Sequence, residues 1–257
     1  MGKENKGFIA EFMTGFDSSA ALAPDIMILT GAGISAESGL QTFRGAGGLW
    51  CGHRVEDVAT PEAFARNPAL VHQFYNERRQ GLLSDEVAPN PAHIALARLQ
   101  KEWAGEVTIV TQNIDDLHER GGAENVMHMH GEILRSFCLH CRNKIDQRAD
   151  SSTDDTCGSC AKTGGMRPDI VWFGEMPYLM DEIETKLLNA DLFISIGTSG
   201  NVYPAAGFVR TADFSGAKTL EINLEPSQNA YEFTHGIYGK AGAEVPQFVD
   251  QLLKEQQ

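Results

Sequence analysis

Six short apolar runs, spread over most of the chain, restrict most strongly how it can fold. Continuous apolar runs of this kind are typical of strands that are buried on both faces of a sheet. Helix-like patterns at 91–103, 178–189 and 245–254 separate several of the runs. This alternation predicts an α/β fold with a doubly wound, parallel, Rossmann-like sheet. The predicted strands cover residues 26–29, 107–110, 126–129, 170–173, 192–196 and 220–224.

Two segments interrupt the alternation. Residues 45–88 carry helical patterns but no apolar strand run, and residues 133–167 include a polar stretch with four of the five cysteines. We expect both to be insertions that form a smaller lobe, one a helical insertion and the other a zinc-binding module. The Rossmann-like domain would then consist of residues 22–44, 89–132 and 168–257.

A glycine-rich turn follows the first predicted strand. Gly31, Gly33 and Ala36 fit the pattern G-x-G-x-x-G/A, in which the glycines let the backbone turn tightly and approach a pyrophosphate. The same pattern also fits a strand-to-helix turn without a ligand. A dehydrogenase would place an acid about 20 residues downstream at a strand end. Glu56 and Asp57 lie in a stretch without a strand pattern, which disfavours that class.

The cysteines predict a metal site. Cys138 and Cys141 form one Cys-x-x-Cys pair, and after fifteen residues Cys157 and Cys160 form another, which is the spacing of a four-thiolate zinc site. Four thiolates complete a tetrahedral shell, so we expect one structural Zn²⁺. Free thiols and a nucleic-acid zinc ribbon are the alternatives, and the acidic segment disfavours the ribbon. Cys51 is interpreted as an ordinary thiol.

Charge and hydropathy exclude several classes of partner. The net charge of −14 argues against general binding to nucleic acids or anionic membranes. No apolar run approaches the about 20 residues of a membrane-spanning helix, and the first residues lack the apolar core of a signal peptide. We therefore expect a cytoplasmic protein with no specific nucleic acid and no membrane among its partners.

Seven motifs then follow one another in a specific order: "GAGISAESGLQTFRG", "TQNIDDLHERGG", "MHGE", the two cysteine pairs, "RPDIVWFGE", "GTSGNVYPAAG" and "INLE". In this respect residues 25–245 resemble the sirtuins, which are NAD-dependent protein lysine deacylases. The resemblance implies that NAD is a co-substrate. The enzyme would break the bond from nicotinamide to ribose, capture the ribose carbon with the acyl oxygen of a modified lysine, and release 2′-O-acyl-ADP-ribose.

The resemblance also assigns catalytic roles. His128 and His130 would share one face of a strand, so periodicity cannot choose between them. His130 precedes Gly131 as the base of the family does, and His128 and the other histidines are interpreted as structural. His130 and Asn113 are the predicted catalytic residues. The predicted NAD-binding residues are Gly31, Ala32, Gly33, Ala36, Phe43, Arg44, Gln112, Asn113, Ile114, Asp115, Gly197, Thr198, Ser199, Asn223, Leu224, Glu225 and Ala241.

By the same resemblance, acyl-lysine proteins would bind as an extended strand beside residues 171–174. Tyr75 and Arg78 are three residues apart on a predicted helix and match the Tyr-x-x-Arg pattern of sirtuins that remove acidic acyl groups. A packed tyrosine beside a solvated arginine, and a plain core strand at 171–174, are the alternatives. Because similar bacterial members also accept acetyl groups, we expect deacetylase and desuccinylase or demalonylase activity. The predicted substrate-binding residues are Ala59, Tyr75, Arg78, Val171, Trp172, Phe173 and Gly174.

Three other functions remain as alternatives. An NAD-dependent oxidoreductase would share the glycine turn but leave the cofactor intact. A mono-ADP-ribosyltransferase would use the same cleavage and pass the ribose to protein. A module that binds ADP-ribose or acyl-lysine without turnover is disfavoured by the presence of both His130 and Asn113.

Overall fold

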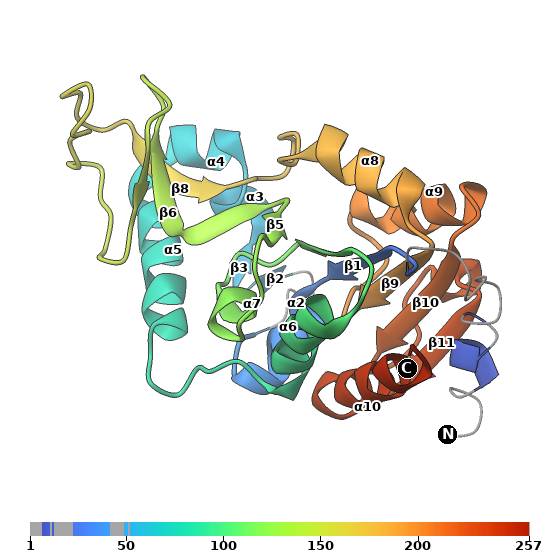
Figure 1. Cartoon of the computed structure of the whole chain (residues 1–257). Coiled ribbons are helices and arrows are strands. Elements are labelled where there is room, and N and C mark those ends of the chain that lie inside the picture. The colour runs from blue at the N-terminus through green and yellow to red at the C-terminus, as the bar shows by residue number, and fades with distance from the viewer. Residues whose placement is uncertain (1–6, 11, 13–22, 42–48, 51, 257) are drawn as a thin grey trace.

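The computed structural model describes residues 7–10, 12, 23–41, 49–50 and 52–256. A six-stranded sheet with the order β11-β10-β9-β1-β4-β5 lies at its centre, and all of its paired strands run parallel (Figure 1). The predicted Rossmann-like α/β architecture is confirmed. The strands are β1 (Ile26–Thr30), β4 (Val107–Thr111), β5 (Met127–His128), β9 (Leu192–Ile196), β10 (Lys218–Asn223) and β11 (His235–Tyr238).

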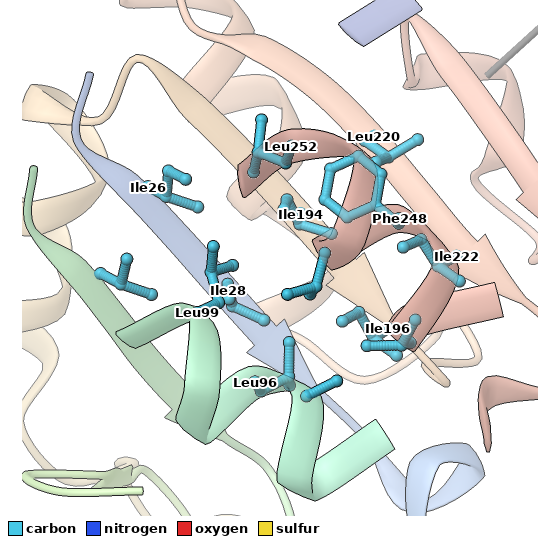
Figure 2. Close-up of a cluster of buried hydrophobic side chains, with 14 of the residues drawn as sticks. Ile26, Ile28, Leu96, Leu99, Ile194, Ile196, Leu220, Ile222, Phe248 and Leu252 are labelled. Atoms are coloured by element: carbon cyan, nitrogen blue, oxygen red, sulfur yellow. The ribbon is translucent and has the colours of Figure 1, made fainter. Parts of the chain in front are cut away.

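The parallel sheet is buried on both faces, as its apolar runs predict. Alternate residues of β1 enter different cores, with Ile26 and Ile28 in one and Met27 and Leu29 in the other. The first core is covered by α6 (Pro91–Glu102) and α10 (Ala241–Glu255), and the second by α8 (Met180–Asn189) and α9 (Phe208–Phe214). Figure 2 shows the first core, to which the two helices contribute Leu96, Leu99, Phe248 and Leu252.

A smaller lobe stands beside the parallel sheet (Figure 1). Its antiparallel sheet has the order β7 (Lys144–Asp146), β6 (Gly131–Cys138), β8 (Met166–Ile170). Apolar side chains of α5 (Pro68–Leu82), including Phe74 and Tyr75, pack on Ile133 and Ile170 of this sheet in a separate core. The lobe also contains the hairpin of β2 (Leu49–Trp50) and β3 (His53–Arg54), with α3 (Val55–Val58) and α4 (Pro61–Arg66).

Three helices begin at the same local signal, a capping side chain followed by proline. Thr60, Asn67 and Asn90 each accept a hydrogen bond from a backbone N–H in the first turn of α4, α5 and α6, at 3.0, 3.1 and 2.9 Å. Proline has no N–H to leave unpaired in that turn, so it suits the first position. The remaining short helices are α2 (Ala32–Ser35), α7 (Leu117–Arg120), and the 3₁₀ turns Ala36–Ser38, Ala205–Gly207 and Ala230–Glu232.

The prediction of a parallel strand at residues 170–173 is wrong. The run 170–173 is not part of the parallel sheet, because β8 ends at Ile170 and pairs antiparallel with β6. An apolar run does not reveal which sheet it joins, and β8 itself buries Arg167 and Asp169, which no apolar pattern announces. The edge strand β11 was not predicted either. Near the N-terminus, Ile9 and Phe12 lie in the first core.

No helix of the described residues has the length and apolar character needed to cross a membrane.

A glycine-lined crevice and a four-cysteine site

The loops that follow β1 and β9 approach so closely that side chains are excluded. Gly31 and Gly33 donate backbone hydrogen bonds to Ile196 and Gly197 at 3.0 and 2.9 Å. A Cβ atom on Gly33 would lie 2.7 Å from the Cα of Gly197. Because β1 lies between β9 and β4, the sheet order reverses here, and crevices at such points bind ligands in open α/β sheets. The glycines thus bring α2 to the edge of the crevice.

Polar side chains after β4 form the floor of this crevice. Asn113 donates from Nδ2 to the carbonyl of Gly31 and to Oγ of Ser35, both at 3.2 Å. Ser35 in turn donates to Oδ2 of Asp115 at 3.1 Å, while Oδ1 of Asp115 accepts from the N–H of Leu117 at 3.2 Å. Asp115 therefore caps the start of α7 and also joins the crevice. Burial raises the pKa of Asp115 to about 6.

Two buried histidines support this floor. From the sequence, both were interpreted as structural. Nε2 of His93 lies 3.4 Å from Oγ of Ser35, and Nε2 of His118 lies 2.9 Å from Oγ1 of Thr30. Burial lowers the pKa of His93 to about 4 and that of His118 to about 3. Both rings are therefore neutral at physiological pH. Ser35 was missed, since a serine inside a glycine-rich turn carries no distinguishing signal.

His130 and His128 differ in their hydrogen bonds. Nδ1 of His130 lies 3.0 Å from the carbonyl oxygen of Gln112, which can only accept, so Nδ1 carries the proton. No described residue bonds to Nε2, which holds the lone pair. Burial lowers the pKa of His130, and the bond to Gln112 opposes the shift only in part. His130 is thus a neutral imidazole with one nitrogen open to accept a proton.

His128 differs from His130 because both of its ring nitrogens have hydrogen-bond partners. Its Nε2 lies 2.7 Å from the carboxylate of Glu119, and its Nδ1 lies 3.4 Å from the carbonyl of Asn113. Both partners only accept, so both ring nitrogens donate. Burial by itself would lower the pKa of His128, but the bond to Glu119 outweighs it and raises the pKa. His128 therefore has no free nitrogen for proton abstraction.

Residues at the ends of β9 and β10 border the crevice on the other side. Asn223 donates from Nδ2 to the carbonyl of Thr198 at 2.7 Å and so ties the two strand ends together. Thr198 and Gln112 line a small cavity on the face of the sheet covered by α9. Leu224 is 66% exposed at the rim. Ala241 begins α10, the helix whose next residue, Gly242, donates to Glu37 at 2.9 Å.

The residues predicted to bind substrate lie together in the smaller lobe. The carbonyl of Ala59 accepts from the N–H of Phe173 at 3.0 Å, and the carbonyl of His130 accepts from the N–H of Val171 at 2.9 Å. Residues 171–174 therefore connect the crevice to the helical insertion. Gly174 has φ of 90°, which allows the turn after this segment.

Tyr75 and Arg78 occupy an aromatic cluster of α5 and its neighbours. Tyr75 is fully buried, and its hydroxyl accepts a hydrogen bond from Nε1 of Trp172 at 2.9 Å. The guanidinium of Arg78 lies over the ring of Phe74, 3.3 Å from its centroid, and 5.9 Å from that of Trp50. The Nε atom of Arg78 is buried without a partner among the described residues. Its Nη1 donates to the carbonyl of Phe74 and lies 3.8 Å from Oε2 of Glu77. A half-buried cation with one unpaired donor can accept an anionic ligand group.

The four cysteine sulfurs converge as the spacing predicts. All lie within 4.8 Å of one another, with Cys138 to Cys160 at 3.7 Å and Cys141 to Cys157 at 3.6 Å. Four sulfurs at about 2.3 Å from one tetrahedral zinc lie about 3.8 Å apart. The donor set therefore fits a four-thiolate Zn²⁺ with no open coordination position.

The two cysteine pairs have the same backbone geometry. In each pair the first cysteine accepts at 2.8 Å from the N–H four residues later, at Arg142 and Ala161, and both of these residues have positive φ, of 62° and 57°. Each first cysteine also donates to the carbonyl five residues later. Amides of Cys160 and Ser159 lower the pKa of Cys157 to about 6, which favours the thiolate that zinc requires. Both turns are thus preformed for metal binding.

Phe43 and Arg44, predicted to flank the reacting ribose, lie outside the described residues.

The sheet, the glycine-lined crevice and the four-cysteine lobe define a Rossmann-like protein with a zinc module. The Sir2 family model matches residues 31–204. The chain is 58% identical over 231 residues to an NAD-dependent protein deacylase of Vibrio cholerae, covering 90% of this chain and 94% of the relative. It is 60% identical over 233 residues to the NAD-dependent protein deacylase SIR2rp3 of Leishmania major, covering 90% and 96%. The chain therefore belongs to the Sir2 family.

Solved structures of the family agree with the fold. A Sir2 homolog in complex with NAD is similar with a TM-score of 0.85 and 33% identity, covering 98% of this chain and 95% of that one. Sir2Af2 bound to a myristoylated histone peptide is similar with a TM-score of 0.72 and 29% identity, covering 98% of each chain.

Proposed function

We propose that this chain is an NAD-dependent protein lysine deacylase that releases nicotinamide and 2′-O-acyl-ADP-ribose. The observation that carries the proposal is the state of His130. Its Nδ1 proton is fixed by the carbonyl of Gln112, and no described residue bonds to its Nε2. Such an imidazole can take a proton from a ribose hydroxyl near neutral pH. The names of the relatives support NAD and acyl-lysine as the substrates.

In this proposal the crevice first separates nicotinamide from ribose. Asp115 would hold the carboxamide and Asn113 the ribose, and the network through Ser35 fixes both side chains. The acyl oxygen of the lysine then bonds to the freed ribose carbon and forms an imidate. His130 removes the proton of the ribose 2′-hydroxyl, whose oxygen attacks the imidate carbon, and water completes the release of the free lysine. The glycine loop, with Gly31, Ala32 and Gly33, cradles the phosphates.

The substrate would enter as an extended strand beside residues 171–174. Three observations support this position: the contact of Val171 with His130, the contact of Phe173 with Ala59, and the 47% exposure of the Phe173 side chain. Because the N–H groups of Val171 and Phe173 are bonded within the protein, the peptide would pair with other backbone groups of this segment. Backbone pairing gives affinity with little dependence on peptide sequence.

The acyl group would reach Tyr75 and Arg78. Arg78 has a side chain that is 16% exposed and lies 3.8 Å from Glu77, and the ring of Trp50 contacts both the Arg78 guanidinium and the Tyr75 ring. A succinyl or malonyl carboxylate would replace the weak contact of the guanidinium with the rings by a charge-assisted hydrogen bond. An acetyl group has no carboxylate to pair with Arg78. The same enzyme would therefore accept both acyl classes through different contacts.

Peptides carrying acetyl-, succinyl- or malonyl-lysine, incubated with NAD, test this function. Release of nicotinamide in proportion to free lysine is expected, with loss of the reaction in His130→Ala. Reduction of NAD without release of nicotinamide would instead indicate an oxidoreductase. Retention of labelled ADP-ribose on protein would indicate a mono-ADP-ribosyltransferase.

A further inference from the structure

Helix α5 has a second polar face, next to the one that carries Tyr75 and Arg78. His72, Asn76 and Arg79 lie along it at intervals of four and three residues. This face contacts the segment 147–151, which connects β7 to the second cysteine pair. The function proposed above assigns no role to these three residues.

Asn76 and Ser151 form the centre of the contact. Asn76 donates from Nδ2 to the carbonyl of Ser151 at 2.8 Å, and its Oδ1 accepts from the N–H of Ser151 at 2.9 Å and from its Oγ at 3.2 Å. Nδ1 of His72 lies 2.8 Å from the same Oγ. Asn76 thus satisfies both backbone groups of one residue, as a neighbouring strand would. Ser151 is 4% exposed, so these bonds are shielded from water.

Arg79 adds a buried charge to the contact. It is fully buried and donates to Oδ1 of Asn76 at 2.7 Å, to the carbonyl of Ala149 at 3.4 Å, and to the carbonyl of Ile133 in β6 at 3.1 Å. Burial lowers the pKa of Arg79, and Asp150 and Asp155 oppose that shift through their charge. One side chain therefore joins α5, the zinc-binding segment and the antiparallel sheet.

We propose that Asn76 is a positioning residue that couples the zinc module to the acyl pocket. Asn76 follows Tyr75, and Arg79 follows Arg78, so the bonds that fix the segment 147–151 also fix the rotation of α5 and the direction of the pocket side chains. This inference rests on the proposed acyl-pocket function. The coupling works in both directions, because a segment released from α5 also holds its cysteines less firmly.

Asn76→Ala in the zinc-loaded, full-length protein tests the coupling with two measurements. The first is the KM for succinyl and acetyl peptides, and the second is the rate at which zinc passes to a chromogenic chelator. We expect the succinyl KM to rise about tenfold, which corresponds to the loss of a buried hydrogen-bonding partner. The acetyl KM should stay within about twofold, and zinc transfer should be several-fold faster.

Gly81→Ala is the matched control, because Gly81 is an exposed residue of the same helix at which an added Cβ meets nothing within 4 Å. It should change neither measurement. Ser151→Ala removes the Oγ bonds but keeps the backbone pair, and it should give a smaller effect in the same direction. This second variant keeps the test decisive if Asn76→Ala fails to fold.

An equal rise in both KM values, or zinc transfer at the wild-type rate, would overturn the coupling while leaving the deacylase function intact. If the wild-type protein does not turn over succinyl peptides at all, the acyl-pocket function fails first and the coupling to it fails with it.

Discussion

The indole Nε1–H of Trp172 donates a hydrogen bond of 2.9 Å to the phenolic oxygen of Tyr75. The indole nitrogen can only donate, so Tyr75 is the acceptor and keeps its own proton for another partner. Burial raises the pKa of Tyr75 well above its usual value, and the phenol remains protonated. Trp172, from the segment proposed to bind the peptide, thereby orients a donor of the proposed acyl pocket.

Trp172→Phe should weaken succinyl turnover through Tyr75. The variant keeps an aromatic ring but leaves the Tyr75 oxygen without its donor, so kcat/KM for succinyl peptides should fall about fivefold to tenfold with a smaller effect on acetyl peptides. In a Tyr75→Phe background the same change should add little. Trp103→Phe is the control, because its Nε1 donates to the remote carbonyl of Pro24. Independent, additive losses in the double variant would contradict the orientation of Tyr75 by Trp172.

Arg78→Met should separate the two acyl classes. Methionine keeps much of the apolar stem but loses the charge, and kcat/KM for succinyl-lysine should fall by about a hundredfold or more, the equivalent of a charged hydrogen bond. Acetyl-lysine turnover should change little. Arg66→Met removes an exposed arginine that pairs with Asp57, and it should leave both rates unchanged. Equal loss on both peptides in Arg78→Met would reject the assignment of the pocket.

The activity should decline at acid pH as His130 becomes protonated. Burial places the pKa of His130 below its usual 6.5, so the neutral base is fully present at pH 7 and above and is lost as the pH falls through that lower value. Asp115, with a pKa of about 6, also loses its charge as the pH falls below neutral. We expect the plot of log kcat/KM against pH to have a slope greater than one on its acid side. A limb that reflects a group titrating above pH 7 would contradict the role of His130.

Glu119→Gln should lower stability in a pH-dependent way through His128. The folded-state pKa of His128 is raised, so its contribution is complete below about 6.5, the unfolded value, and is lost as the pH rises through the folded pKa. Because Glu119 is 41% exposed, the loss should be about 1 kcal/mol or less. Thermal unfolding at pH 5.5 and pH 9 measures it. The same destabilisation at both pH values would show that the ion pair is not its cause.

Gly33→Ala should damage the crevice itself. The added Cβ would lie 2.7 Å from the Cα and carbonyl oxygen of Gly197, so the two loops must separate. We expect a loss of about 1–3 kcal/mol in the free energy of unfolding and weaker binding of NAD by calorimetry. Gly81→Ala is the control, since a Cβ there meets nothing within 4 Å. Wild-type stability of Gly33→Ala would show that the contact of the two loops is not tight.

The sequence by itself determined the parallel sheet, the helix that begins at Pro91 and the cluster of four cysteines. These features depend on short-range properties: apolar runs buried on both faces, a capping side chain before proline, and the fixed spacing of two Cys-x-x-Cys turns. Each is encoded within a few residues, so no long-range contact was needed to predict it. The motifs of the family added predictions for the residues around the crevice.

The tertiary structure decided what surrounds the pocket, and it gives the physical reason for the difference between the two histidines. His128 and His130 are equivalent in spacing and differ only because Glu119 reaches one of them. The run 170–173 is not in the parallel sheet. β8 pairs with β6 instead, because packing between segments that are distant in the sequence decides which strands pair. The contacts of Ser35 with His93 and of Asn76 with Ser151 also join segments that are far apart in the sequence. Hydrogen bonds between distant segments depend on how the chain folds back, which local sequence patterns do not record.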